Sequence, residues 1–167
     1  MFFTVALATR GDDLLVREVA RLRAAVRVTR DERPLHIDAW VVLPDHVHAV
    51  WTLPDGDCDF STRWRLIKSR FSMGLPTGKL RQSHITRHER AVWQRRFWEH
   101  HIRDDEDYRA HVQYCWINPV KHGLVDAPAI GPFHHTTAIC GVRDFMQHLR
   151  GVIVKGVVRE ITHPTAI

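Results

Sequence analysis

Short apolar runs alternate along the chain with longer segments in which apolar residues recur at helical spacing. The first run, Phe2 to Thr9, is rich in Phe, Val and Thr, which is typical of a strand. Asp12 then has the character of a helix N-cap. The spacing that follows predicts a helix over about 13–30, on five apolar positions: Leu14, Leu15, Val19, Leu22 and Val26.

Two further apolar runs predict a hairpin. Leu35 to Leu43 and His46 to Leu53 both have the composition of strands, and the Pro44-Asp45 pair between them is typical of a turn. Because the connection is so short, we expect the two strands to be antiparallel neighbours.

The next part of the chain predicts two helices and one more strand. Ser61 is a candidate cap for a helix over about 62–73, and residues 74–86 contain the Gly, Pro, Ser and Thr of a loop. Residues 91–102 are compatible with a strand rich in aromatic side chains. Acidic residues at 104–107 favour a helix start, and Pro119 favours a stop after Asn118.

The predicted order is strand, helix, strand, strand, helix, strand, helix. This order fits an α+β fold with a ferredoxin-like antiparallel sheet and helices packed on one face. Beyond Val125 the pattern weakens, so we expect one domain over residues 1–125 and a divergent, irregular tail over residues 126–167.

Composition adds an excess of positive charge to this ordinary globular pattern. The 167 residues fit one domain, and hydrophobic residues at 44% can form a core. Cys58, Cys115 and Cys140 form no C-x-x-C pair, which argues against a disulfide framework and a cysteine-built zinc site. No apolar run approaches the roughly 20 residues of a membrane helix. We expect a soluble, cytoplasmic, nucleoid-associated protein with no membrane partner.

The positive charge is concentrated in one segment. Residues 61–103 hold eleven Lys and Arg but only two acidic residues, a net charge of +9 against +5 for the whole chain. Four of the six Trp lie in or just beyond this segment. Interleaved Arg and Trp suit phosphates and unstacked bases, so nucleic-acid binding is one interpretation. A solvated basic helix beside core tryptophans is another, and a metal-free RNA-binding domain is a third.

The chain contains one H-x-H sequence, His46-Val47-His48. On a strand, residues two apart face the same side, so both imidazoles can converge on one divalent metal. With 13 His in the chain, however, about one such motif is expected from composition alone, and an ordinary surface or core pair is the alternative. His84 and His88 are as readily explained by chance, and we assign them no role.

A second constellation lies on the last predicted helix. That helix carries both tyrosines, Tyr108 and Tyr114, and Asn118 follows Tyr114 by four residues, on the same helix face. A Tyr beside a metal ligand is a workable nucleophile for phosphate chemistry, because the metal withdraws charge from the phosphate. The alternative is a helix side chain followed by a C-terminal capping group.

Three segments together resemble a known family: residues 35–53 (LHIDAWVVLPDHVHAVWTL), 60–72 (FSTRWRLIKSRFS) and 93–125 (WQRRFWEHHIRDDEDYRAHVQYCWINPVKHGLV). They are similar to the REP-associated tyrosine transposases, which are single-tyrosine HUH transposases of the bacterial insertion-sequence type. The resemblance extends over residues 2–125 and includes the PDHVH and NPVKHGLV blocks. Cys115-Trp116, where relatives often carry Ile-His, and the tail depart from the family pattern.

The resemblance implies a metal-dependent tyrosine transposase with a ferredoxin-like fold. Tyr114 corresponds to the nucleophile, and His46, His48 and Asn118 correspond to the ligands of Mg²⁺ or Mn²⁺. Family members cleave and rejoin single-stranded DNA next to repeat hairpins through a 5′-phosphotyrosine intermediate. The implied partners are single-stranded DNA and REP-type DNA hairpins, bound by a monomer or homodimer. The alternative is a catalytically silent remnant that only binds the hairpin.

Basic and aromatic residues are the candidate DNA contacts, although each of them is also compatible with a solvated surface position. We expect contacts to the hairpin backbone from Arg63, Lys68 and Arg70. We expect contacts to single-stranded bases from Arg95, Arg96 and Trp98, and a contact to phosphate near the cut from Lys121.

Overall fold

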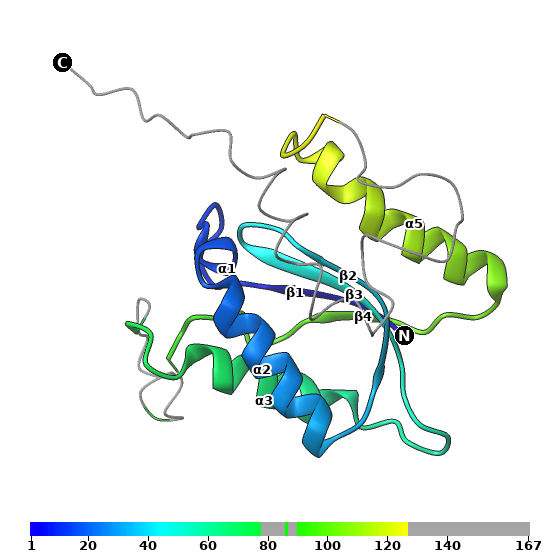
Figure 1. Cartoon of the computed structure of the whole chain (residues 1–167), viewed down its shortest axis with the longest axis horizontal. Helices are drawn as coiled ribbons and strands as arrows, with labels where there is room; N and C mark the ends of the chain where they lie inside the picture. The colour runs from blue at the N-terminus through cyan, green and yellow to red at the C-terminus, as the bar shows by residue number, and fades with distance from the viewer. Residues whose placement is uncertain (78–85, 87–89, 127–167) are drawn as a thin grey trace.

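Four antiparallel strands form one sheet, with helices on both of its faces (Figure 1). The computed structural model describes residues 1–77, 86 and 90–126. The sheet has the spatial order β2-β3-β1-β4 and consists of β1 (Phe2–Ala6), β2 (His36–Val42), β3 (His46–Thr52) and β4 (Trp98–His100). The helices are α1 (Leu14–Arg17), α2 (Val19–Glu32), α3 (Phe60–Ser72) and α5 (Asp105–Lys121).

This arrangement confirms the predicted α+β fold. Helices α2 and α3 cover one face of the sheet, and the tyrosine-bearing helix α5 is the additional element on the other face (Figure 1). In the part of the chain that the structure describes, no helix is long and apolar enough to cross a membrane. The predicted tail from residue 127 onward, His84 and His88 lie outside the described residues.

The central strands direct their side chains alternately to the two faces of the sheet. Phe3 and Val5 of β1 belong to the core under α2 and α3, whereas Phe2 belongs to the smaller cluster under α5. The register between β1 and β3 pairs Thr4 with His48, and Ala6 with His46. Both histidines are therefore on the α5 side of the sheet.

Tryptophans dominate the core between the sheet and α2 and α3. Trp51 and Trp64 stack with ring centroids 4.4 Å apart, and Trp40 stacks on Trp64 at 5.5 Å. All three rings are buried. Of the Trp residues in the basic segment, Trp64 and Trp93 are thus core residues, while Trp98 is 55% exposed.

The two helices predicted over 13–30 and 62–73 differ from the structure in a break and in a cap, respectively. The helix expected over 13–30 is divided at Glu18, which ends α1 and precedes α2. Ser61 was the wrong cap for α3, because the carboxylate of Asp59 accepts the N–H of Thr62 at 3.1 Å. Aspartate is as good an N-cap as serine, and it comes two residues earlier in the chain.

The last strand and the last helix also differ in length from their predictions. Of the strand expected over 91–102, only Trp98–His100 pairs continuously with β1. Helix α5 does not stop at Asn118 but continues to Lys121, with Pro119 inside it. A proline lacks one N–H, yet the helix continues past it, and at its end the His122 N–H donates to the Asn118 carbonyl at 3.1 Å. The extra turn keeps Asn118 within the helix.

Candidate active site

Strand β3 holds His46 and His48 side by side in the layer between the sheet and α5. Their ring centroids are 4.9 Å apart, and both side chains are buried. The strand period of two residues accounts for their common direction. The structure therefore brings together the two predicted metal ligands from the H-x-H sequence.

One nitrogen of each ring is held by a neighbouring polar side chain. His48 Nδ1 lies 2.8 Å from Thr4 Oγ1, on the adjacent strand, and His46 Nδ1 lies 2.6 Å from Asp45 Oδ1. Partners of this kind fix the orientation of metal-binding imidazoles and select the nitrogen that remains for the metal. For both histidines that nitrogen is Nε2.

Helix α5 places Tyr114 and Asn118 against this histidine pair. The Tyr114 ring centroid is 5.0 Å from that of His48, and the exposed ring also contacts Phe2. Asn118 follows one turn later and is 1% exposed. The four predicted site residues thus gather from two elements, β3 and α5, that are distant in the sequence.

Two buried polar atoms of this cluster have no hydrogen-bond partner among the residues that the structure describes: His48 Nε2 and Asn118 Oδ1. A buried polar atom without a partner costs about 1–3 kcal/mol, so such atoms are rare unless a ligand or water completes them. Imidazole nitrogen and amide oxygen are both ordinary donors to divalent cations. The residues present therefore fit a divalent metal ion held by His46, His48 and Asn118.

The electrostatic setting keeps both imidazoles neutral. Burial, with smaller contributions from the neighbouring His46 and His122, lowers the pKa of His48 to about 3. Burial also lowers the pKa of His46, although Asp45 opposes this shift. Because a metal binds only the deprotonated ring, these shifts favour coordination at neutral pH.

Comparisons with known proteins show the family of the chain. No protein-family model matches the chain. It is, however, 47% identical over 132 residues to the REP-associated tyrosine transposase of Escherichia coli K12, covering 79% of this chain and 73% of that protein. A Haemophilus influenzae protein with the same family designation is 38% identical, covering 79% of this chain and 76% of the relative. The chain belongs to the REP-associated tyrosine transposases.

A solved structure extends this assignment to the fold. The structure of a REP-associated tyrosine transposase bound to a REP hairpin matches with a TM-score of 0.66 and 44% identity, covering 89% of this chain and 79% of that one. The family identified from sequence segments is therefore confirmed by both sequence and structure.

The predicted DNA contacts fall into two groups. Arg96 and Trp98 are exposed, and exposed Lys121 places Nζ 5.1 Å from the Tyr114 ring centroid. Arg95 is also exposed, next to the backbone that Lys68 contacts. These residues lie at the surface, where DNA can approach them.

Arg63 and Arg70 instead have structural partners. Arg63 is 2% exposed, and its guanidinium donates to Asp57 and to the carbonyls of Arg33 and Pro34. Arg70 donates to Thr29 Oγ1 at 2.7 Å and pairs with Glu32, which ties α3 to α2. Arg63 is a buried residue, so we do not retain it as a DNA contact.

His122 is a site neighbour that sequence reasoning did not identify. Its ring centroid lies 5.3 Å from that of His46. Tyr114, Asn118 and His122 are spaced by four residues each, so one face of α5 presents all three. That spacing is the sequence signal that could have found it.

A second cluster lies near the N-terminal end of α5. Asp107 contacts His100 Nε2 at 2.8 Å and His111 Nδ1 at 3.0 Å, and Arg103 also donates to it. Hydrogen bonds from His100 and Arg103 hold the pKa of Asp107 well below its usual range. The three ligand atoms are close enough to hold a metal ion, although the carboxylate already has these hydrogen-bond partners. The cluster connects β4 to α5.

Proposed function

We propose that this protein cleaves and rejoins single-stranded DNA next to repeat hairpins, through a 5′-phosphotyrosine intermediate on Tyr114. The observation that carries the proposal is the contact of the Tyr114 ring with His48, whose buried Nε2 has no hydrogen-bond partner among the described residues. Asn118, one turn after Tyr114 on α5, has a buried Oδ1 that likewise lacks a described partner. A nucleophile beside side chains that can bind a divalent metal suits metal-assisted phosphoryl transfer. The solved relative bound to a REP hairpin supports a hairpin-bearing DNA as the substrate.

The chain's own residues position the attack. The edge contacts of the Tyr114 ring with His48 and Phe2 set the direction of its hydroxyl. Tyr114 Oη loses its proton to solvent and bonds to phosphorus, the bond from phosphorus to the 3′ oxygen breaks, and the released 3′ oxygen takes up a proton to become the 3′-hydroxyl. Lys121 Nζ lies over the Tyr114 ring, where its positive charge can stabilise the negative charge of the phosphate.

We propose Mg²⁺ or Mn²⁺ as the cofactor, held by His46, His48 and Asn118. When bound, such a cation supplies Lewis-acid withdrawal of charge from a phosphate oxygen. The three protein donors carry no negative charge, so they leave the positive charge of the ion available to the substrate. The covalent link conserves the energy of the phosphodiester, so the 3′-hydroxyl can attack it again and rejoin the strand.

The test is a covalent-adduct assay on labelled single-stranded DNA that carries the repeat hairpins flanking the gene. The protein is incubated with Mn²⁺ or Mg²⁺, denatured, and separated on a gel, with an EDTA control. We expect a denaturation-resistant adduct from the wild type and none from Tyr114→Phe.

Tyr108→Phe is a matched control on the same helix. Tyr108 donates to Asp38 at 3.3 Å, and burial together with Asp38 raises its pKa to about 12, so it is poorly suited to attack. The control should form the adduct at the wild-type level. Hairpin binding that survives EDTA with no adduct under any condition would instead indicate a catalytically silent binding protein.

A further inference from the structure

His100, Asp107 and His111 form a compact cluster between the last strand and the tyrosine-bearing helix. The Asp107 carboxylate faces both imidazoles: Oδ2 lies 2.8 Å from His100 Nε2, and Oδ1 lies 3.0 Å from His111 Nδ1. Each side chain offers one possible ligand atom, and these atoms all lie within 4.8 Å of one another. Within the described part of the chain, no other three His, Cys, Asp or Glu side chains meet in this way.

The fold brings these three side chains together from two adjacent elements. Asp107 and His111 are four residues apart on α5, so they share one face of the helix. His100 is the last residue of β4, and the short connection at 101–104 joins it to the start of α5. The two imidazole rings stack with their centroids 4.6 Å apart, and both present a nitrogen to the carboxylate.

Two imidazoles and one carboxylate are a donor set for a divalent transition metal. Zn²⁺ binds nitrogen and carboxylate oxygen readily, whereas Mg²⁺ prefers an all-oxygen octahedral shell. Ligand atoms around a tetrahedral Zn²⁺, at bonds of about 2.0–2.1 Å, lie roughly 3.3 Å apart. The separations of 2.8 and 3.0 Å at Asp107 are already close to that value. Three protein ligands leave the fourth position for water.

The charge and protonation of the cluster are compatible with an ion. Hydrogen bonds from His100 and Arg103 hold the pKa of Asp107 well below its usual range, so its carboxylate is anionic at neutral pH. A metal needs an unprotonated imidazole nitrogen, and a neutral ring provides one by carrying its proton on the other nitrogen. The Arg103 side chain is 74% exposed, so it can turn into solvent when an ion takes its place at Asp107.

The cluster lies beside the nucleophile but differs in charge from the donors around it. Asp107 adds a negative charge, which the neutral set of His46, His48 and Asn118 does not have. An ion held by Asp107 is partly neutralised, so it is better suited to joining two elements than to withdrawing charge from a phosphate. Its position serves that purpose, because the Phe2 ring contacts both His111, at 4.6 Å between centroids, and Tyr114, at 5.8 Å.

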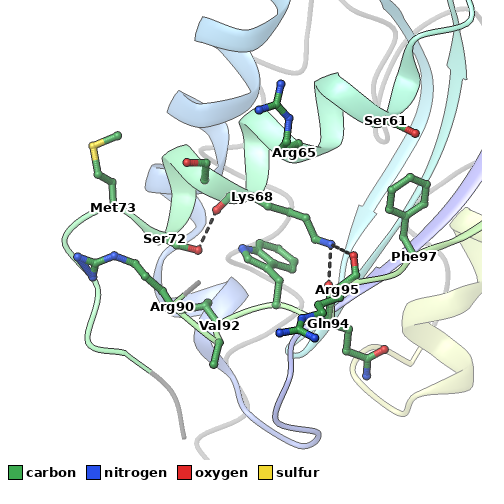
Figure 2. Close-up of a pocket in the computed structure, with 13 residues that line it drawn as sticks. Ser61, Arg65, Lys68, Ser72, Met73, Arg90, Val92, Gln94, Arg95 and Phe97 are labelled. Carbon is green, nitrogen blue, oxygen red and sulfur yellow. Dashed lines mark hydrogen bonds between the residues drawn. The ribbon is translucent and has the colours of Figure 1, made fainter. Parts of the chain in front are cut away.

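The strand that the cluster holds is the short edge strand of the sheet. β4 has three residues and pairs only with β1. Just before β4, Lys68 on α3 donates to the carbonyls of Gln94 at 2.7 Å and Arg95 at 3.3 Å (Figure 2). At the other end of β4, His100 provides a connection to α5. An ion at His100 would strengthen this second connection.

We propose that His100, Asp107 and His111 bind a divalent transition-metal ion, with Zn²⁺ as the ion that fits the donors, and that this ion clamps the end of β4 to α5. The ion is separate from the Mg²⁺ or Mn²⁺ proposed at the histidine pair on β3. Its role is to hold the first turns of the helix that carries Tyr114.

The test is Zn²⁺ binding to the full chain, measured by equilibrium dialysis without DNA and without a polyhistidine tag. His48→Gln serves as the background, because it removes a ligand from the other candidate metal site. We expect the background protein to bind Zn²⁺ and the added change His111→Gln to weaken the binding of one equivalent by roughly tenfold or more. His101→Gln, at the exposed position next to His100, is the matched control and should leave the binding unchanged.

Amide hydrogen exchange in the otherwise wild-type chain tests the clamp itself. Zn²⁺ should slow exchange in the first turns of α5 by roughly tenfold, and it should have no such effect in His111→Gln. Circular dichroism monitors the fold of each variant. If His111→Gln does not fold, His100→Gln replaces it and should show the same losses, because it removes a ligand from β4 and not from the helix.

The site is ruled out if the background protein and its His111→Gln variant bind Zn²⁺ equally, or if His101→Gln weakens binding as much as His111→Gln does. Zn²⁺ binding that requires His111 but leaves the exchange of α5 unchanged would overturn the clamp. Because no DNA is present, none of these results bears on the Tyr114 adduct, and a missing adduct does not bear on the Zn²⁺ site.

Discussion

The two faces of the sheet bury different kinds of side chain. The face under α2 and α3 buries a cluster of three tryptophans, in which the rings of Trp40, Trp51 and Trp64 each stack with the other two. The face under α5 buries His46, His48 and Asn118 instead. Both faces bury polar atoms that have no hydrogen-bond partner among the described residues. Under α2 and α3 these include the indole N–H groups of Trp51 and Trp64, whereas under α5 they are His48 Nε2 and Asn118 Oδ1, which can bind a metal ion.

The contrast indicates a division of labour between stability and chemistry. Apolar burial on the α2 and α3 face supplies stabilisation in proportion to the area removed from water. Each unpaired buried atom on the α5 face subtracts about 1–3 kcal/mol. Burial on the α2 and α3 face therefore offsets the cost of the unpaired atoms on the α5 face. Removing a buried ring from the first face should lower the free energy of unfolding, whereas removing an unpaired polar atom from the second should raise it.

The largest expected effect is on the aromatic face. Trp64→Ala removes a fully buried ring and leaves a cavity next to Trp51, so we expect a loss of about 3–5 kcal/mol in the free energy of unfolding. Urea denaturation measures this loss. Trp98→Ala, at an exposed position in the same basic segment, should change stability by less than about 0.5 kcal/mol. Equal losses of unfolding free energy in the two variants would contradict the distinction between a core tryptophan and a surface tryptophan.

The next effect is at the buried arginine of the same face. Arg63→Met keeps much of the side-chain volume but leaves Asp57 and the carbonyls of Arg33 and Pro34 without their donor. We expect a loss of about 3 kcal/mol in unfolding free energy, together with unchanged hairpin binding. Arg96→Met should show the reverse pattern, weaker DNA binding at wild-type stability. If the Arg63 variant bound DNA more weakly at wild-type stability, Arg63 would be a DNA contact after all.

Arg63 shows why the cationic residues could not be sorted from the sequence. Arg63, Lys68 and Arg70 have the same helical spacing as solvated surface charges, and composition treats them alike. Their roles are decided by tertiary partners: the turn at Asp57, the end of α2 and the backbone at Gln94. Those partners come from other parts of the chain, up to 41 residues away.

The element order and the central site were predictable for different reasons. Strand alternation at β2 and β3 and helical spacing on α2 depend on the local sequence, so the fold class followed from them. His46, His48, Tyr114 and Asn118 were found through the family segments. Thr4, which orients His48, was not found, because its contact depends on the register between β1 and β3.

A smaller effect concerns pH and the histidine face. The pKa of His48 is about 3 in the folded protein and 6.5 in a free side chain, so below pH 6.5 the unfolded chain binds a proton that the folded chain does not. Stability is therefore lost as the pH falls. At one pKa unit per 1.4 kcal/mol, His48 should cost about 2 kcal/mol at pH 5 relative to pH 7.5.

Urea unfolding in EDTA at the two pH values measures this cost. His48→Gln should remove about 2 kcal/mol of the pH dependence, whereas His36→Gln, at an exposed position, should leave it in place. A pH dependence that His48→Gln does not alter would show that the ring is protonated in the folded state.

The smallest effect has the opposite sign and separates the two faces most sharply. Asn118→Leu replaces a buried amide, whose Oδ1 has no partner, with an apolar side chain of similar size. Because an unsatisfied acceptor is removed from a buried position, we expect the metal-free protein to gain about 1 kcal/mol in unfolding free energy. The same variant loses a metal donor, so added Mn²⁺ should raise its melting temperature less than that of the wild type. A variant that is less stable in EDTA, and that Mn²⁺ stabilises as fully as the wild type, would mean that Asn118 serves the fold and not the metal. The expected result would instead show that the α5 face gives up stability to keep an oxygen in place for a ligand.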